Sequence, residues 1–321
     1  MPKNLVIYTT SRVRTTKLMR IFADGINTQS PNEWDIKILP IDSFLENSAH
    51  IKDTDAIACF GILRGTGLAL QEAARLGIDR YFIDHAYFNR GYGGEGWLRL
   101  SKNKHTLNYM KTPNTGRWEE IFSKEYEHQI KPWKHKGSRG DKILILPPTH
   151  AMKWYFRCHN WEKELVEKLK KLLPEHHYSK IKIRPKPNEP IVDKLGNLLR
   201  FDKSVPEDAL SLEQDLQEAN IVIAYNSNVT LEATRLGIPV ITSNHNCSYP
   251  ISFDLNDLLV NFHNPKFDIE PDRLSLFRWL ANNQFTKERV SGEEGSWSSS
   301  GAYSPYNKRT ETKEEKLFKK I

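Results

Sequence analysis

The chain has 321 residues, of which 38% are hydrophobic and 27% are charged, and its net charge is +7. This length suggests about two domains, and the composition is globular rather than fibrous or disordered. No apolar run approaches the roughly 18 residues that span a bilayer, so we expect a soluble protein without membrane insertion. The three scattered cysteines suit neither a disulfide framework nor a zinc site, and this usage favours the cytoplasm.

The first part of the chain alternates short apolar runs with amphipathic segments. A loop at 61–67 contains three glycines, but it is neither a Walker A loop nor a clean G-x-G-x-x-G, so no NAD site is predicted. Alternation of strands and helices at this spacing predicts βαβ units and a parallel sheet. The predicted strands are 4–8, 35–39, 55–60 and 79–83, and the predicted helices are 16–25 and 68–76.

The stretch 84–142 lacks clean periodicity and is rich in glycine, aromatic and basic residues. Between Arg99 and Lys142 there are eleven Lys or Arg residues against five Asp or Glu residues. We interpret it as an elaborated active-site loop, followed by an interdomain connection around 131–141. The positive charge indicates a polyanionic partner, such as nucleic acid, an anionic glycan or a phospholipid surface, or else a merely solubilising surface.

The βα pattern then restarts, so the predicted fold class is α/β with two Rossmann-like domains that face a central cleft. Ligands of such sheets bind beyond the carboxyl ends of the strands. The predicted domains are 1–135 and 136–290, with a C-terminal helix that crosses back, and a polar, charged tail follows at 291–321. The second set of strands is predicted at 142–146, 180–184, 220–224 and 238–242, and the helices at 161–173, 212–219, 230–236 and 272–282.

The strongest local signal follows the predicted strand 220–224. Asn226, Ser227 and Asn228 form a polar turn before a helix, where backbone N–H groups and the helix dipole favour an anion. Glu232 lies about one turn into that helix, where its carboxylate can accept a hydrogen bond from a ribose hydroxyl. The alternative is that one of the three turn residues only caps the helix and that Glu232 is solvated.

The segment from Leu231 to Val240 reads L-E-A-x-x-x-G-x-P-V and resembles the GT-B glycosyltransferases, over roughly 142–283. The resemblance implies that Ser227 and Asn228 hold the diphosphate of a nucleotide sugar and that Glu232 binds its ribose. Sugar-nucleotide epimerases of the GT-B fold share the motif.

Two further segments fit a donor site. Arg184 and Lys186, in I-K-I-R-P-K-P, look like a strand-end loop of capsule-polysaccharide transferases and can neutralise a diphosphate leaving group; the alternative is an exposed basic strand end. Thr149 and Lys153 follow the strand 142–146 and are assigned to the donor side, against the alternative of a plain turn. Without a D-x-D motif or a His pair, no metal and no cofactor is predicted, and a UDP-sugar is the favoured co-substrate.

Asp84 and His85 stand at the carboxyl end of the predicted strand 79–83. Transfer with inversion needs a general base for the acceptor hydroxyl, and either residue can serve while the other orients it. Alternatively, Asp84 caps a turn and His85 is a packed residue; Glu95 is a weaker candidate base.

The predicted acceptor-binding residues are cations interleaved with aromatic residues. Such a surface can track phosphates and stack bases, or grip an anionic sugar; the alternative is a loop packed by its own aromatics. Of these residues, Arg90, Arg99 and Lys102 lie in the aromatic and basic stretch, and Arg64 lies in the glycine loop 61–67, which we expect to face the same cleft.

The predicted function is therefore a nucleotide-sugar-dependent glycosyltransferase. The favoured acceptor is a hydroxymethylated base in DNA, as in phage DNA-modifying glucosyltransferases, because the chain is compact, has a basic region and lacks membrane signals. If it is phage-encoded, such an enzyme would act in the host cytoplasm. The alternatives are transfer to a capsular or lipid-linked glycan, a sugar-nucleotide epimerase, and a non-catalytic nucleic-acid-binding protein.

Overall fold

The computed structural model describes residues 1–88, 96–106, 116–186, 191–192, 198–200, 211–260 and 264–286. The chain divides into two compact units, which are described separately below. Unit 1 consists of Met1–Glu125 and Phe277–Ile321, and unit 2 of Tyr126–Leu276. The chain therefore leaves unit 1, builds unit 2, and returns to unit 1.

Unit 1 is built on a sheet whose described strands run in the order β12-β5-β4-β3-β1-β2. Strands β1 to β4 are parallel, whereas β5 and β12 are antiparallel to their neighbours. Its elements are β1 (Lys3–Thr9), α1 (Val13–Gln29), β2 (Trp34–Pro40), α2 (Ile41–Glu46), η1 (Ser48–Asp53), β3 (Ala56–Phe60), α3 (Thr66–Arg75), β4 (Asp79–His85), β5 (Leu98–Lys102), η2 (Trp118–Phe122) and β12 (Gln284–Phe285).

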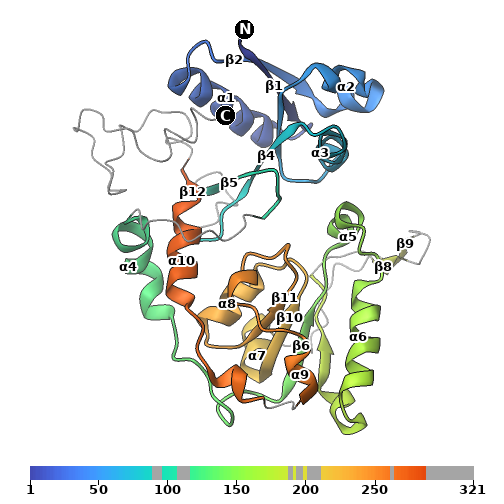
Figure 1. Cartoon of the computed structure of the whole chain (residues 1–321), viewed down its shortest axis with the longest axis vertical. Helices are drawn as coiled ribbons and strands as arrows, with labels where there is room; N and C mark the ends of the chain where they lie inside the picture. Colours follow the sequence, from blue (N-terminus) through green and yellow to red (C-terminus); the bar gives the residue numbers. More distant parts are fainter. Residues whose placement is uncertain are drawn as a thin grey trace. The chain divides into compact units, whose positions relative to one another are not determined.

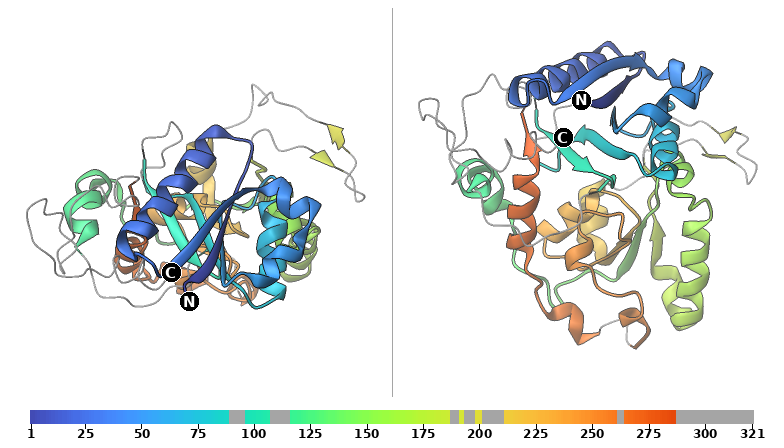
Figure 2. Two further views of the ribbon diagram at one scale, coloured as in Figure 1. Left: turned by 90° about the horizontal axis from the view of Figure 1, so that it is seen from above. Right: turned by 45° about the horizontal axis from the view of Figure 1, so that its top comes forward.

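The two faces of this sheet are covered by different helices (Figure 2). Leu5 and Ile7 of β1 point to one face, where they pack with Met19 and Phe22 of α1. On the other face, the ring of Tyr8 meets Phe44 of α2 edge-on at 5.8 Å. Because side chains alternate along a strand, adjacent residues of β1 supply two separate cores.

The returning C-terminal segment is part of the core of unit 1. Arg117, which is fully buried, donates hydrogen bonds to the carbonyl oxygens of Ala281, Asn282 and Gln284. The side-chain oxygen of Gln284 accepts hydrogen bonds from the backbone N–H groups of Tyr87 and Phe88. These bonds fasten β12 to the sheet at its β5 edge.

Unit 2 has a parallel sheet whose described strands run in the order β11-β10-β6-β7 (Figure 1). A separate pair of short strands, β8 (Ile191–Val192) and β9 (Leu198–Arg200), is antiparallel. The other elements are α4 (Ser123–Tyr126), which spans the unit boundary, η3 (Glu127–Gln129), β6 (Lys142–Leu146), α5 (His150–Phe156), α6 (Trp161–Leu172), η4 (Glu175–Lys180), β7 (Ile181–Ile183), α7 (Leu212–Glu218), β10 (Ala219–Ala224), α8 (Val229–Arg235), β11 (Val240–Thr242), η5 (Tyr249–Ile251), α9 (Asp257–Val260), η6 (Pro265–Asp268) and α10 (Arg273–Asn282), which begins in unit 2 and ends in unit 1.

The sheet of unit 2 is also covered on both faces. Ile143 and Ile145 of β6 pack with Leu165 and Leu169 of α6. Leu144 and Leu146 of the same strand belong to a second core, which includes residues of α7 and α8. Burial on both faces explains why β10 reads as a continuous apolar run and not as an alternating one.

The sequence-based strands and helices of both βα series are confirmed, and the fold class is α/β with two Rossmann-like sheets. The sequence predicts an active-site loop and an interdomain connection over 84–142, but the described residues of this stretch are partly built into the two units. The stretch contributes β5 to the sheet of unit 1, and its segment 131–141 is packed into unit 2. There Trp133 and Arg139 are buried and donate to the carbonyl oxygen of Phe267.

The glycine of the L-E-A-x-x-x-G-x-P-V motif is required by packing. Gly237 has φ +76°, and a Cβ atom there would lie 2.2 Å from the carbonyl oxygen of Pro132. We expect Gly237→Ala to lower the free energy of unfolding by about 3 kcal/mol or more, because strain and a backbone clash combine. Gly77→Ala is the matched control, since Gly77 has φ +75° but nothing within 4 Å of its Cβ position. Urea denaturation of both variants measures the difference, and equal losses would contradict the packing role.

Candidate functional site

In both sheets, the first and third strands in chain order lie side by side, each with a further parallel strand on its other side. The parallel strands are in the order β2-β1-β3-β4 in unit 1 and β7-β6-β10-β11 in unit 2. Connections leave in opposite directions at this point, so the loops after the two central strands diverge and leave room for a ligand. In unit 2 these loops are 147–149 after β6 and 225–228 after β10, and in unit 1 they are 10–12 after β1 and 61–65 after β3.

The turn 225–228 in unit 2 contains three of the predicted donor-binding residues, and each is half-buried. The hydroxyl of Ser227 accepts a hydrogen bond from the N–H of Val229 at 3.3 Å, whereas Asn228, the N-cap residue of α8, makes no side-chain capping bond. Among the described residues, no acceptor is found for the backbone N–H of Asn226, Ser227 or Asn228. Successive N–H groups of this kind can bind an anion through the turn itself.

Glu232 lies on α8, four residues after Asn228, and is half-buried. Helix α8 is only two turns long, so its dipole adds little to the site. The position one turn into the helix is as predicted, and its role toward a ribose stays a prediction.

The loop after β6 carries Thr149 and leads to Lys153. The hydroxyl of Thr149 accepts from the N–H of Met152 at 3.4 Å, which caps α5. Lys153 is ion-paired with Glu162, so part of its charge is already compensated. Thr149 therefore lies in the loop at the switch point, Lys153 lies on the helix that follows it, and each has a local partner.

Arg184 follows β7, the strand beside β6, and its backbone N–H donates to the carbonyl oxygen of Ile145. Its guanidinium is ion-paired with Asp215 of α7, a side chain that is only 1% exposed. Lys182 reaches the other oxygen of the same carboxylate at 2.5 Å. Lys182 also lies 3.9 Å from a carboxylate oxygen of Glu218, so these two cations stand beside two carboxylates. Lys186 is exposed.

Asp215 was missed by the sequence-based reasoning. The available signal was an acidic residue beside Leu216 on the inward face of the predicted helix 212–219. Its burial beside two cations indicates that it holds Arg184 in place.

We expect Asp215→Asn to weaken the binding of a nucleoside diphosphate about tenfold, because the variant releases the guanidinium from its ion pair. Glu213→Gln is the matched control, since Glu213 lies on the same helix and is exposed. Calorimetric titration measures both affinities. Undiminished affinity in a folded Asp215→Asn variant would remove the positioning role of Asp215.

In unit 1, Asp84 at the end of β4 belongs to a buried charge network. Its carboxylate accepts from Arg99 at 3.0 Å and lies 3.4 Å from the ring nitrogen Nε2 of His105, while Arg99 also donates to the hydroxyl of Tyr87. Burial opposes ionisation of Asp84, but Arg99 and His105 outweigh it and hold the pKa of this carboxyl well below its usual range. A carboxylate of such low basicity suits orientation better than proton abstraction.

His85, the other predicted base, is half-buried. Its backbone N–H donates to the second oxygen of Asp84 at 2.7 Å, and its ring meets Phe60 edge-on at 5.5 Å. The structure thus brings Asp84 and His85 together at the carboxyl ends of β3 and β4.

The predicted acceptor-binding cations have different environments. Arg64 lies in the loop 61–65 with φ +59°, a left-handed conformation. Lys102 is ion-paired with Asp79 at 2.5 Å, and Arg99 is buried in the network of Asp84. Arg90 and the alternative base Glu95 lie outside the described residues.

The aromatic residues of the same stretch are mostly core. Phe88 packs against Trp118 and Phe277, and Trp97 packs against Phe122. Each of these side chains is less than 10% exposed. The described aromatics are therefore packed among themselves, as the loop-packing alternative states.

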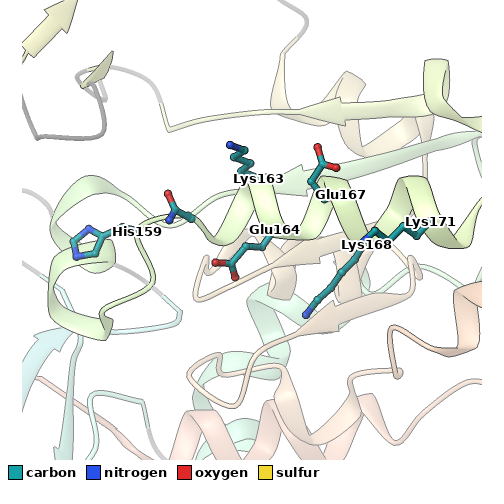
Figure 3. A pocket seen from close by; sticks show the side chains of 7 residues that line it. His159, Lys163, Glu164, Glu167, Lys168 and Lys171 are labelled. Atoms are coloured by element: carbon teal, nitrogen blue, oxygen red, sulfur yellow. The ribbon is translucent and has the colours of Figure 1, made fainter.

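A shallow depression lies along the exposed face of α6 (Figure 3), where lysines and glutamates alternate. Side chains of opposite charge three or four residues apart along a helix are typical of a solvated face. Within the described part of the chain, there is no cluster of three or more His, Cys, Asp or Glu residues that would suit a metal ion. No helix in that part is long and apolar enough to cross a membrane.

No protein-family model and no curated protein matches the sequence. Similar solved structures include sugar transferases and epimerases. Two are Thermosulfurimonas dismutans KpsC, as beta Kdo 2,7 transferase (13% identity, 91% of this chain and 100% of that chain, TM-score 0.46) and as beta Kdo 2,4 transferase (13%, 88% and 91%, TM-score 0.46). A third is a putative UDP-N-acetylglucosamine 2-epimerase from Listeria monocytogenes (11%, 91% and 94%, TM-score 0.26). At these values no activity or residue role is carried over to this chain.

Proposed function

We propose that this chain is a glycosyltransferase whose unit 2 binds the diphosphate of a nucleotide sugar at the switch point between β6 and β10. The observation that carries the proposal is that two independent features able to bind an anion follow the carboxyl ends of parallel strands of the same sheet. The turn 226–228, which follows β10, has backbone N–H groups that can donate to an anion. Arg184 follows β7, which is separated from β10 by β6 alone, and it supplies a positive charge. In this proposal, Glu232 binds the ribose of the same donor.

In the proposed reaction, an acceptor hydroxyl attacks the anomeric carbon and the bond from that carbon to the diphosphate oxygen breaks. Negative charge develops on the departing diphosphate, where fixed N–H donors and a guanidinium stabilise it. Arg184 suits this role because Asp215 fixes its direction. No metal is needed in this proposal.

The proton of the attacking hydroxyl needs a base, and His85 is our candidate. Asp84 is held in its charged form by Arg99 and His105, which favours an orienting role. The carboxylate of Asp84 accepts a hydrogen bond from the backbone N–H of His85, which supports the proposal that His85 is the base and Asp84 holds it in position.

For the acceptor, we propose a lipid-linked glycan. The region around Gly65 in unit 1 exposes Leu45, Leu63 and Leu68, which are 53%, 45% and 56% exposed, next to Arg64. Leu45 lies within 3.4 Å of the Cβ position of Gly65, so these side chains surround one loop. Exposed leucines beside a cation suit an amphiphilic anionic acceptor. A DNA acceptor has less support, because the described aromatics that would stack bases are buried.

The test is incubation with UDP-, GDP- and CMP-sugars and with either a lipid-linked oligosaccharide or hydroxymethylated DNA, followed by mass spectrometry. The proposal expects a mass gain of one sugar on the lipid-linked acceptor. A gain on DNA alone would replace the acceptor but keep the transferase. Conversion of the nucleotide sugar without any acceptor would instead indicate an epimerase.

A further inference from the structure

We infer that Asn246 is a positioning residue that sets the direction of the peptide group between Ser227 and Asn228, and hence of the N–H that binds the donor diphosphate. This inference rests on the proposed function. Asn246 lies in the segment 243–248, which follows β11 and has no predicted role from the sequence.

The side chain of Asn246 is 2% exposed and uses both of its polar atoms. Its amide nitrogen donates to the carbonyl oxygen of Ser227 at 3.0 Å. Its amide oxygen accepts from the N–H of Ser248 at 2.8 Å and lies 2.9 Å from the hydroxyl oxygen of Thr230. The side chain therefore ties the end of β11 to the turn after β10.

The carbonyl oxygen of Ser227 is held from several sides. Besides Asn246, the hydroxyl and the N–H of Thr230 lie 2.9 Å and 3.3 Å from it. Thr230 is fully buried, and the hydroxyl of Ser248, also fully buried, donates to the hydroxyl of Thr230. A buried network in which each member has a partner fixes one arrangement.

A fixed carbonyl also fixes the N–H of the next residue. In a planar trans peptide, the C=O and the following N–H point in opposite directions. Since the Ser227 carbonyl points at Asn246 and Thr230, the N–H of Asn228 points away from them. No described residue accepts this N–H. The same loop reaches the side chain of Asn228, because the thiol of Cys247 lies 3.7 Å from its amide oxygen.

The sharpest test is Asn246→Asp, which keeps the shape and the acceptor of this side chain but removes the donor to Ser227. A carboxylate oxygen then faces the carbonyl oxygen and repels it. We expect the dissociation constant of the best-binding member of UDP, GDP, CDP and ADP to rise about tenfold. Asn244→Asp is the matched control, since Asn244 is exposed on the same loop, and we expect it to bind as the natural chain does.

Binding of a second ligand distinguishes a loss of diphosphate positioning from general damage to the binding site. The nucleoside that corresponds to that diphosphate carries no phosphate, so its affinity should be the same in Asn246→Asp and in the natural chain. Equal loss for both ligands, or undiminished diphosphate binding in folded Asn246→Asp, would overturn the inference.

If Asn246→Asp does not fold, Thr230→Val provides the same readout, since it removes one donor to the Ser227 carbonyl without adding charge. We expect weaker diphosphate binding in this variant, and natural affinity would overturn the inference. Failure of the natural chain to bind any of the four diphosphates would instead overturn the proposed function together with the inference.

Discussion

Arg184→Ala should lower the rate of sugar transfer by about 10²–10³-fold, the loss typical when one fixed donor to developing negative charge is removed. The guanidinium is held at the end of β7 by Asp215, a buried carboxylate. Its removal takes away the guanidinium that is proposed to stabilise the diphosphate and leaves Lys182 as the partner of Asp215. Steady-state kinetics with saturating nucleotide sugar measures the effect.

Lys186→Ala is the control for Arg184→Ala. Lys186 lies two residues further along and is exposed, so we expect less than a few-fold change. Equal losses in the two variants would indicate a diffuse basic surface. An active Arg184→Ala variant would exclude Arg184 from the donor site.

Arg117→Ala should lower the free energy of unfolding by about 3 kcal/mol or more, a large part of the roughly 5–15 kcal/mol that stabilises a domain. The guanidinium binds three carbonyl oxygens, at the end of α10 and on β12, and its central carbon Cζ lies 5.3 Å from the ring centre of Phe285. Truncation leaves these carbonyls without that donor inside the protein. Chemical denaturation followed by tryptophan fluorescence measures the loss.

Arg278→Ala is the matched control for Arg117→Ala. Arg278 lies on α10 and pairs with Glu119, but both side chains are 39% exposed. Such a pair contributes about 0–1 kcal/mol. Comparable losses in the two variants would contradict the claim that Arg117 fastens the returning segment to unit 1.

Regular βα repeats were the part of the fold that local pattern could predict. Apolar runs such as 220–224 and 142–146 are buried on both faces of a sheet, so hydrophobicity alone identifies them. Strand β5 was missed because it is short and lies in a glycine- and charge-rich stretch, and because one of its two partners, β12, is distant in sequence. The buried Arg139 was read as part of a linker for the same reason, since its partner Phe267 lies far along the chain.

The residues of the candidate site also divide into those that local sequence pattern predicts and those that it does not. The turn 226–228 and Arg184 were found because each follows a recognisable strand. Asp215 and Asn246 were not, because their importance depends on contacts made across the fold. Nothing local distinguishes Asn246 from the exposed Asn244 two residues before it. The role of Asp84 changed most, because Arg99 and His105, its partners, are 15 and more residues away.

The most direct test of the donor site is a calorimetric titration of the whole chain with UDP, GDP, CDP and ADP, in buffer that contains EDTA. We expect one of these ligands to bind with one site per chain and a dissociation constant between about 1 μM and 1 mM, the usual range for enzyme substrates. The same ligand should bind Arg184→Ala much more weakly. Absence of binding by all four ligands to the folded natural chain would contradict the nucleotide-sugar site.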